Sequence, residues 1–174
     1  LNSQASSVER LVMEAKPAGS LCDGYDRKTV SVLRGGMAEG RLIGGNLSVL
    51  CAALGTPFQP EFKGRILFFE DISEKPYKLD RMLTQLLNAG ILQQVAGVAV
   101  GVNAECDDPN AQPGGEYRQT AADVVKERLV SLRVPVVTGL PFGHVDLNAT
   151  IPVGAKATLD GKRGDLIIAE PAVS

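Results

Sequence analysis

Two ionisable residues stand directly after apolar runs of the chain, where folding could bring them together. The run 64–69 is followed by Glu70, and the run 134–137 leads into a Gly/Pro-rich loop that carries His144, the single histidine of the chain. The carboxyl ends of strands in α/β proteins meet at one edge of the sheet, where ligands bind. A histidine whose ring is held by a carboxylate is the base of a Ser-His-Glu hydrolase. Glu70 and His144 are therefore the predicted catalytic residues.

Each of these residues also has a structural interpretation. A lone histidine in a Gly/Pro-rich loop is commonly exposed to solvent or hydrogen-bonded to the backbone. A carboxylate at the end of a strand commonly caps the next helix, and Asp71, Ser73 and Glu74 are candidates for the same role. The like placement of Glu70 and His144, after neighbouring strands of one sheet, favours the catalytic interpretation.

No serine of the chain has the setting of a nucleophile. Ser48 follows Gly44, Gly45 and Asn46 near a predicted strand-to-helix turn, but its spacing is not the G-x-S-x-G of a nucleophile elbow. Ser48 instead falls in the first turn of the helix, where its hydroxyl can bond the backbone. We interpret Ser48 as structural and Asn46 as the helix N-cap, with Asn46 also a candidate substrate-binding residue.

The periodicity of the apolar residues predicts an α/β fold. Alternating strands and helices in the middle of the chain imply right-handed crossovers and a small parallel sheet. Hairpins at 29–43 and 155–169 are expected to form a second, antiparallel layer. The predicted fold is a β/β/α three-layer domain with a small parallel central sheet and helices on one side. The central strands are expected at 64–69, 95–102 and 134–137, and the helices at 47–54, 76–87 and 120–132.

Composition excludes several classes of function. A chain of 174 residues with 44% hydrophobic content suits one domain, for which we expect residues 19–174, after a polar linker or incoming segment at 1–18. The 18 basic and 20 acidic residues are nearly balanced, so nucleic acid is not an expected partner. No apolar stretch approaches the ~20 residues that span a bilayer, so no membrane contact is expected. Three widely spaced cysteines indicate reduced thiols rather than a metal site, and a cytoplasmic location.

Several segments together resemble the LD-carboxypeptidase family of serine peptidases, which includes muramoyltetrapeptide carboxypeptidase and the microcin C immunity carboxypeptidase. Each segment alone is weak evidence, but their order and spacing are specific. The matching stretches are Gly44-Gly-Asn-Leu-Ser48, Gly55-Thr56, Ile66-Leu-Phe-Phe-Glu-Asp71, Glu74-Lys-Pro-Tyr77, Leu79-Asp-Arg-Met-Leu83, Gly97-Val-Ala-Val-Gly101 and Pro135-Val-Val-Thr-Gly-Leu-Pro-Phe-Gly-His144.

The resemblance implies a two-domain enzyme of which this chain is the C-terminal part. In such enzymes an N-terminal domain carries the nucleophilic serine in a G-x-S-D turn, and a swivelling β/β/α C-terminal domain carries the Glu and His of the triad. By motif match, Glu70 is the triad carboxylate and His144 the general base. No serine of this chain stands in a G-x-S-D context. The expected partner is therefore a nucleophile-bearing N-terminal domain, without which the chain is expected to be inactive.

The resemblance also implies a substrate. The expected reaction removes the terminal D-alanine from cytosolic murein tetrapeptides during peptidoglycan recycling. No metal or organic cofactor is expected. The candidate partners include a second copy of the chain in a homodimer. One alternative is a microcin C immunity-type carboxypeptidase, which is expected to place a tryptophan against a nucleotide base; this chain has no tryptophan. Another is a non-catalytic binding or assembly module. A G-x-S-D serine upstream in the parent gene would separate the last alternative from the enzymes.

Overall fold

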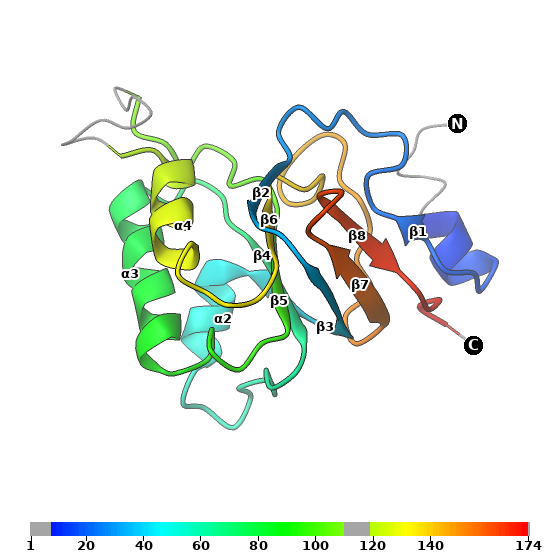
Figure 1. Cartoon of the computed structure of the whole chain (residues 1–174), viewed down its shortest axis with the longest axis horizontal. Coiled ribbons are helices and arrows are strands. Elements are labelled where there is room, and N and C mark those ends of the chain that lie inside the picture. Colours follow the sequence, from blue (N-terminus) through cyan, green and yellow to red (C-terminus); the bar gives the residue numbers. More distant parts are fainter. Residues whose placement is uncertain (1–7, 110–118, 174) are drawn as a thin grey trace.

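One mixed sheet organises the part of the chain that the structure describes, residues 8–109 and 119–173 of a computed structural model. The strands follow the order β1-β8-β7-β3-β4-β5-β6-β2 across the sheet (Figure 1). Their bounds are β1 (Gly19–Ser20), β2 (Ser31–Arg34), β3 (Met37–Asn46), β4 (Ile66–Glu70), β5 (Gly97–Val100), β6 (Val136–Thr138), β7 (Lys156–Asp160) and β8 (Asp165–Ile168).

The centre of the sheet is parallel and is covered by helices on one face. Strands β3, β4, β5 and β6 pair in parallel, in that order. Helices α2 (Leu47–Ala53), α3 (Pro76–Asn88) and α4 (Ala121–Leu129) lie together on one side of these strands (Figure 1). All five residues of β4 are buried, as expected for a strand that is covered on both faces. The predicted α/β fold with a small parallel sheet and helices on one side is confirmed.

Strand β3 connects the parallel strands to the antiparallel strands. Its first half, from Met37 to Arg41, pairs antiparallel with β7, and its second half, from Leu42 to Asn46, pairs in parallel with β4. The hairpin of β7 and β8 packs on the face of the central sheet opposite the helices. There Leu159 and Leu166 share a buried cluster with Ala99 of β5. The antiparallel strands thus cover the second face, which makes the third layer.

Local sequence signals account for the three helices. Pro76 occupies the first turn of α3, and the residues of its buried stripe recur at helical spacing. Thr120 and Asp123 form a reciprocal capping box at the start of α4. Asn46 caps α2 by accepting a hydrogen bond from the backbone N–H of Val49. These predicted helix starts are confirmed. The buried residues of α3 are Leu79, Met82, Leu83 and Leu86.

The N-terminal hairpin predicted at 29–43 is wrong. Strand β2 pairs antiparallel with β6, with Ser31 opposite Thr138, and makes no pair with β3. Strand β6 lies at the end of the parallel strands, and its outer edge accepts β2. The predicted C-terminal hairpin is confirmed, because β7 and β8 pair around a turn at 161–164. Glu70 is the last residue of β4 rather than the residue after it.

The segment predicted as a linker contacts the domain where it is described. Residues Glu9–Met13 form a short π-helical turn, η1, in which Leu11 is fully buried in the cluster that also contains Leu166. The backbone N–H of Ala172 donates to the carbonyl of Leu11. The domain boundary at residue 18 stays a prediction. Part of the predicted 103–118 loop lies outside the described residues. None of the described helices combines the length and the apolar character that crossing a membrane requires.

Replacing Leu83 by Asp should destabilise the fold by about 4 kcal/mol, because the new carboxylate would be buried without a partner among the side chains between α3 and the sheet. Gln85→Asp is the matched control, since Gln85 lies on the exposed face of the same helix. The urea midpoint of unfolding measures both changes. Equal losses would show that the packed face of α3 is assigned incorrectly.

Candidate active site

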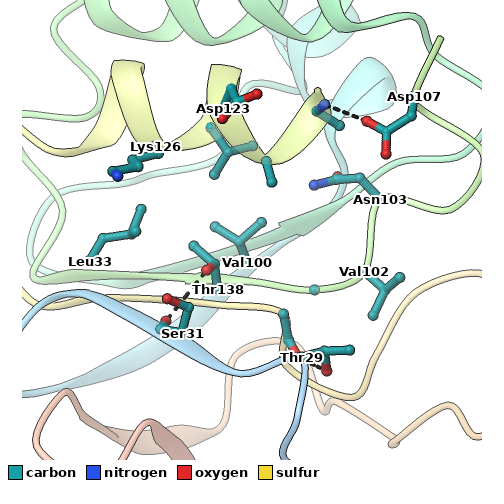
Figure 2. Close-up of a pocket in the computed structure, with 15 residues that line it drawn as sticks. Thr29, Ser31, Leu33, Val100, Val102, Asn103, Asp107, Asp123, Lys126 and Thr138 are labelled. Atoms are coloured by element: carbon teal, nitrogen blue, oxygen red, sulfur yellow. Dashed lines mark hydrogen bonds between the residues drawn. The ribbon is translucent and has the colours of Figure 1, made fainter. Parts of the chain in front are cut away.

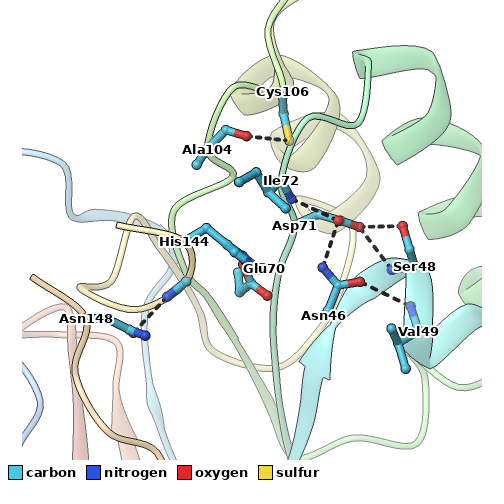
Figure 3. A network of polar contacts seen from close by, with 11 residues as sticks. Asn46, Ser48, Val49, Glu70, Asp71, Ile72, Ala104, Cys106, His144 and Asn148 are labelled. Atoms are coloured by element: carbon cyan, nitrogen blue, oxygen red, sulfur yellow. Dashed lines mark hydrogen bonds and ion pairs between the residues drawn. The ribbon is translucent and has the colours of Figure 1, made fainter. Parts of the chain in front are cut away.

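The two predicted catalytic residues meet at the carboxyl edge of the parallel sheet. Nδ1 of His144 lies 2.7 Å from Oε2 of Glu70. The side chain of Glu70 is only 10% exposed, whereas that of His144 is 51% exposed. One residue ends β4 and the other lies in the loop after β6, so the contact joins positions that are 74 residues apart in the sequence. Figure 3 shows the two side chains beside each other.

The contact sets the chemical state of the histidine ring. An ionised carboxylate can only accept hydrogen bonds, so the tautomer that bonds an ionised Glu70 carries its proton on Nδ1 of His144. In the neutral ring, Nε2 then has a free lone pair and is a proton acceptor. Because half of the His144 side chain is exposed, the ring is accessible to a hydroxyl outside this domain. The pair has the arrangement of a general base with its orienting carboxylate.

Backbone contacts hold the histidine loop against the end of β5. The N–H of Leu140 donates to the carbonyl of Val100, and the N–H of Val102 donates to the carbonyl of Phe142. The N–H of Gly143 donates to Oδ1 of Asn148, which closes the loop on itself. The loop is therefore bonded to β5 before His144 and to Asn148 after it, which holds His144 in place. Gly143 and Asn148 belong to this support, and neither was predicted from the sequence.

A glycine allows the loop to approach Glu70 this closely. Gly143 has a φ of 120°, and a Cβ at this position would lie 2.8 Å from the carbonyl oxygen of Val102 and 3.1 Å from Oε2 of Glu70. A side chain would therefore be strained by its backbone conformation and would also push against the carboxylate. Beneath the loop, the rings of Phe68 and Phe142 pack edge to face with centroids 5.9 Å apart.

Within the part of the chain that the structure describes, a hollow and a larger cavity lie near this edge of the sheet, and the pair lines the hollow. A hollow of about 280 Å³ is lined by Glu70, His144 and their neighbours in the histidine loop. A second cavity, of about 340 Å³, lies between α4 and the ends of β5, β6 and β2 (Figure 2). Asn103, Asp107 and Thr138 line the second cavity, which neither Glu70 nor His144 reaches. The Glu70–His144 pair therefore opens on the smaller hollow and is separate from the larger cavity.

The third predicted site residue, Asn46, lies in a polar network next to the pair (Figure 3). Its Oδ1 accepts from the N–H of Val49, and its Nδ2 donates to Oδ1 of Asp71 at 2.8 Å. Ser48 donates its hydroxyl to Oδ2 of Asp71 at 2.8 Å rather than to the backbone. The predicted cap role of Asn46 is confirmed, and its contact with substrate stays a prediction. Ser48 lies in the first turn of α2 as predicted, but the predicted bond of its hydroxyl to the backbone is wrong, and its structural role stays a prediction.

Asp71 was considered as a cap for the helix that follows it, and this interpretation is wrong. Its carboxylate accepts from the backbone N–H of Ser48, in the first turn of the preceding helix α2. The N-cap of α3 is Lys75, which makes no side-chain capping bond. Glu74 instead forms an ion pair with Lys78, one turn further along α3.

The three cysteines are free thiols buried in the fold. Burial raises the pKa of the Cys22 thiol to about 12 and that of the Cys51 thiol to about 11, and the nearby carboxylates Asp165 and Asp71 add to these shifts. Burial also raises the pKa of Cys106. Among residues 8–109 and 119–173, no group of three or more His, Cys, Asp and Glu side chains is placed to hold a metal ion.

Comparison with known proteins identifies the family. Residues 39–159 match the LD-carboxypeptidase C-terminal domain. The chain belongs to the LD-carboxypeptidase family. It is 50% identical over 131 residues to a putative carboxypeptidase of Synechocystis, covering 75% of this chain and 42% of the relative. It is 40% identical over 126 residues to a probable murein peptide carboxypeptidase of Bacillus subtilis, covering 72% of this chain and 38% of the relative.

The fold also agrees with a solved structure. The microcin C7 self-immunity protein MccF of Escherichia coli superposes with a TM-score of 0.71 at 28% identity, covering 86% of this chain and 43% of that chain. The chain thus spans less than half the length of each of these relatives and corresponds to the C-terminal domain of the family. The family resemblance drawn from the motifs is confirmed.

The native thiols should be inert at neutral pH. Burial raises the pKa of Cys22, Cys51 and Cys106, so the reactive thiolate form of each is scarce at pH 8. An aromatic disulfide reagent should therefore label none of the three cysteines at pH 8 in the folded chain and all three in urea. Rapid labelling of the folded chain would show that a thiol is accessible and would reopen cysteine as a nucleophile.

Proposed function

We propose that this domain supplies the Glu and His of a Ser-Glu-His triad to a serine carboxypeptidase whose nucleophile lies on a separate N-terminal domain. The observation that carries the proposal is the 2.7 Å contact between Glu70 and the half-exposed His144. The family is one of carboxypeptidases, and this chain covers only the C-terminal part of it. The serine and the donors that stabilise the oxyanion would come from the N-terminal domain, and this chain alone would be inactive.

In the proposed mechanism His144 acts first as base and then as acid. Nε2 takes the proton of the serine hydroxyl as the oxygen attacks the carbonyl carbon of the terminal peptide bond. Glu70 holds the ring by its Nδ1–H and stabilises the positive charge that the ring gains. His144 then gives the proton to the leaving amine, which leaves an acyl-enzyme. A water molecule, activated by the same nitrogen, hydrolyses the ester and restores the serine.

The proposed substrate is a murein tetrapeptide that loses its terminal D-alanine from an L,D bond during peptidoglycan recycling in the cytoplasm. Support comes from the Bacillus subtilis relative, a probable murein peptide carboxypeptidase, which is 40% identical, against 28% for the microcin immunity protein. The absence of tryptophan from this chain also favours a peptide over a nucleotide conjugate. A microcin-type activity is the second candidate, because the superposition with MccF covers 86% of the chain. A homodimer stays a prediction.

Variants of a two-domain enzyme test the proposed triad. The enzyme joins this chain to the N-terminal portion of its Synechocystis relative, and turnover is measured as D-alanine release from an L,D-tetrapeptide. Glu70→Gln should lower kcat by roughly 10³–10⁴-fold, because the amide cannot stabilise an imidazolium. His144→Ala should lose about as much, and the double variant little more, because the residues of a triad act as one unit.

Glu39→Gln is the control, since Glu39 is exposed on β3, and it should keep full activity. Near-normal turnover in Glu70→Gln, or losses that multiply in the double variant, would contradict the proposed Glu70–His144 pair. A far higher kcat/KM for an aminoacyl sulfamoyl adenosine than for the tetrapeptide would favour the microcin-type activity instead.

A further inference from the structure

The residue that follows Glu70 carries a buried carboxylate that the proposed mechanism does not use. Asp71 is 2% exposed. Its Oδ1 accepts from Nδ2 of Asn46 at 2.8 Å and from its neighbour's backbone N–H, that of Ile72, at 2.9 Å. Its Oδ2 accepts from both the N–H and the hydroxyl of Ser48, at 3.0 and 2.8 Å. Four donors without formal charge therefore satisfy a carboxylate that burial would otherwise penalise.

These bonds connect the end of β4 to the end of β3 and the start of α2. Asn46 pairs with Glu70 in the sheet and is also the N-cap of α2. On the other side, the backbone carbonyl of Asp71 accepts from the N–H of Ala104 at 3.0 Å, in the segment after β5. The side chain of Asp71 is thus bonded to the end of β3, and its backbone is bonded to the segment that follows β5. Figure 3 shows this network beside Glu70.

Adjacent residues at a strand end project to opposite faces of the sheet. The side chain of Glu70 meets His144 on one face, and that of Asp71 meets α2 on the helical face. A shift or rotation of this strand end would therefore move both side chains together. The hydrogen bonds of Asp71 therefore act on the same strand end that carries Glu70.

We propose that Asp71 is a positioning residue, whose four hydrogen bonds fix the end of β4 so that Glu70 meets Nδ1 of His144. This inference deepens the proposed function and rests on it, because it concerns the same catalytic pair. Asp71 acts through Glu70 and does not touch the reacting atoms. A carboxylate that served only to cap α2 would stabilise the fold but leave the state of the His144 ring unchanged.

The chain offers a direct readout, because His144 is its only histidine. The ¹⁵N resonances of the neutral ring report which nitrogen carries the proton, and in the unsubstituted chain, recorded at a pH where the ring is neutral, they should show predominantly Nδ1–H. Glu70→Gln defines the signal when the carboxylate is lost. Asp71→Asn keeps the side-chain volume but places an amide opposite donors, so it should move the ring signals most of the way toward those of Glu70→Gln.

Asp123→Asn is the matched control, because Asp123 also accepts hydrogen bonds at a helix start, in the capping box of α4. It should lower the urea midpoint while leaving the His144 resonances unchanged. Ser48→Ala removes one donor and keeps the charge of Asp71, so it should give a smaller shift in the same direction as Asp71→Asn. That variant also serves if Asp71→Asn does not fold, and it separates the effect of position from that of charge.

The outcomes separate the two proposals. Ring resonances that move in Asp71→Asn and Ser48→Ala, but not in Asp123→Asn, support the positioning role. If the ring resonances are unchanged in Asp71→Asn, the positioning role is overturned and the proposed triad is left intact. If only Ser48→Ala folds, unchanged resonances in that variant lead to the same conclusion. Absence of the Nδ1–H form from the unsubstituted chain would instead contradict the Glu70–His144 pair, and the positioning role would fail with it.

Discussion

One hydrogen bond, between Nδ1 of His144 and Oε2 of Glu70, carries the catalytic role that we propose for this domain. It joins the end of β4 to the loop after β6, and strand β5 lies between them. The loop must therefore lie close to the ends of both β5 and β4. Glycine makes the approach possible at two points. A Cβ on Gly143 would crowd Glu70, and a Cβ on Gly101 would lie 2.4 Å from the carbonyl oxygen of Phe142. The loop could not lie against β5 with a larger residue at either position.

The two residues of this bond differ in their exposure to solvent. Glu70 is almost enclosed, which strengthens its interaction with the ring, whereas the outer half of His144 is exposed. In the proposed mechanism this exposed side of the ring takes its proton from a serine of another domain. This geometry agrees with a chain that covers less than half the length of its relatives and matches only the C-terminal domain of the family. The fold supplies orientation, and the nucleophile is proposed to come with the other domain.

Much of this site could be predicted because its signals are local in the sequence. Glu70 and His144 each follow an apolar run, and parallel strands bring such positions to one edge. The start of α4 was predictable for the same reason, since Thr120 and Asp123 are three residues apart. The partners of Asp71 were not predictable, because its donors in Ser48 lie 23 residues away and one of them is a backbone N–H. The pairing of β2 with β6 depends on which sheet edge is left free, which no local pattern encodes.

The most direct test of the account compares this chain alone, the N-terminal portion of its Synechocystis relative alone, and the two mixed. The measurement is D-alanine release from an L,D-tetrapeptide after repurification of each part. We expect release only from the mixture, or from the two parts joined in one chain, because we propose that the serine lies in the N-terminal portion and its base in this chain. Release by this chain alone, at a rate that survives repurification, would contradict the claim that it supplies only the base half of a divided active site.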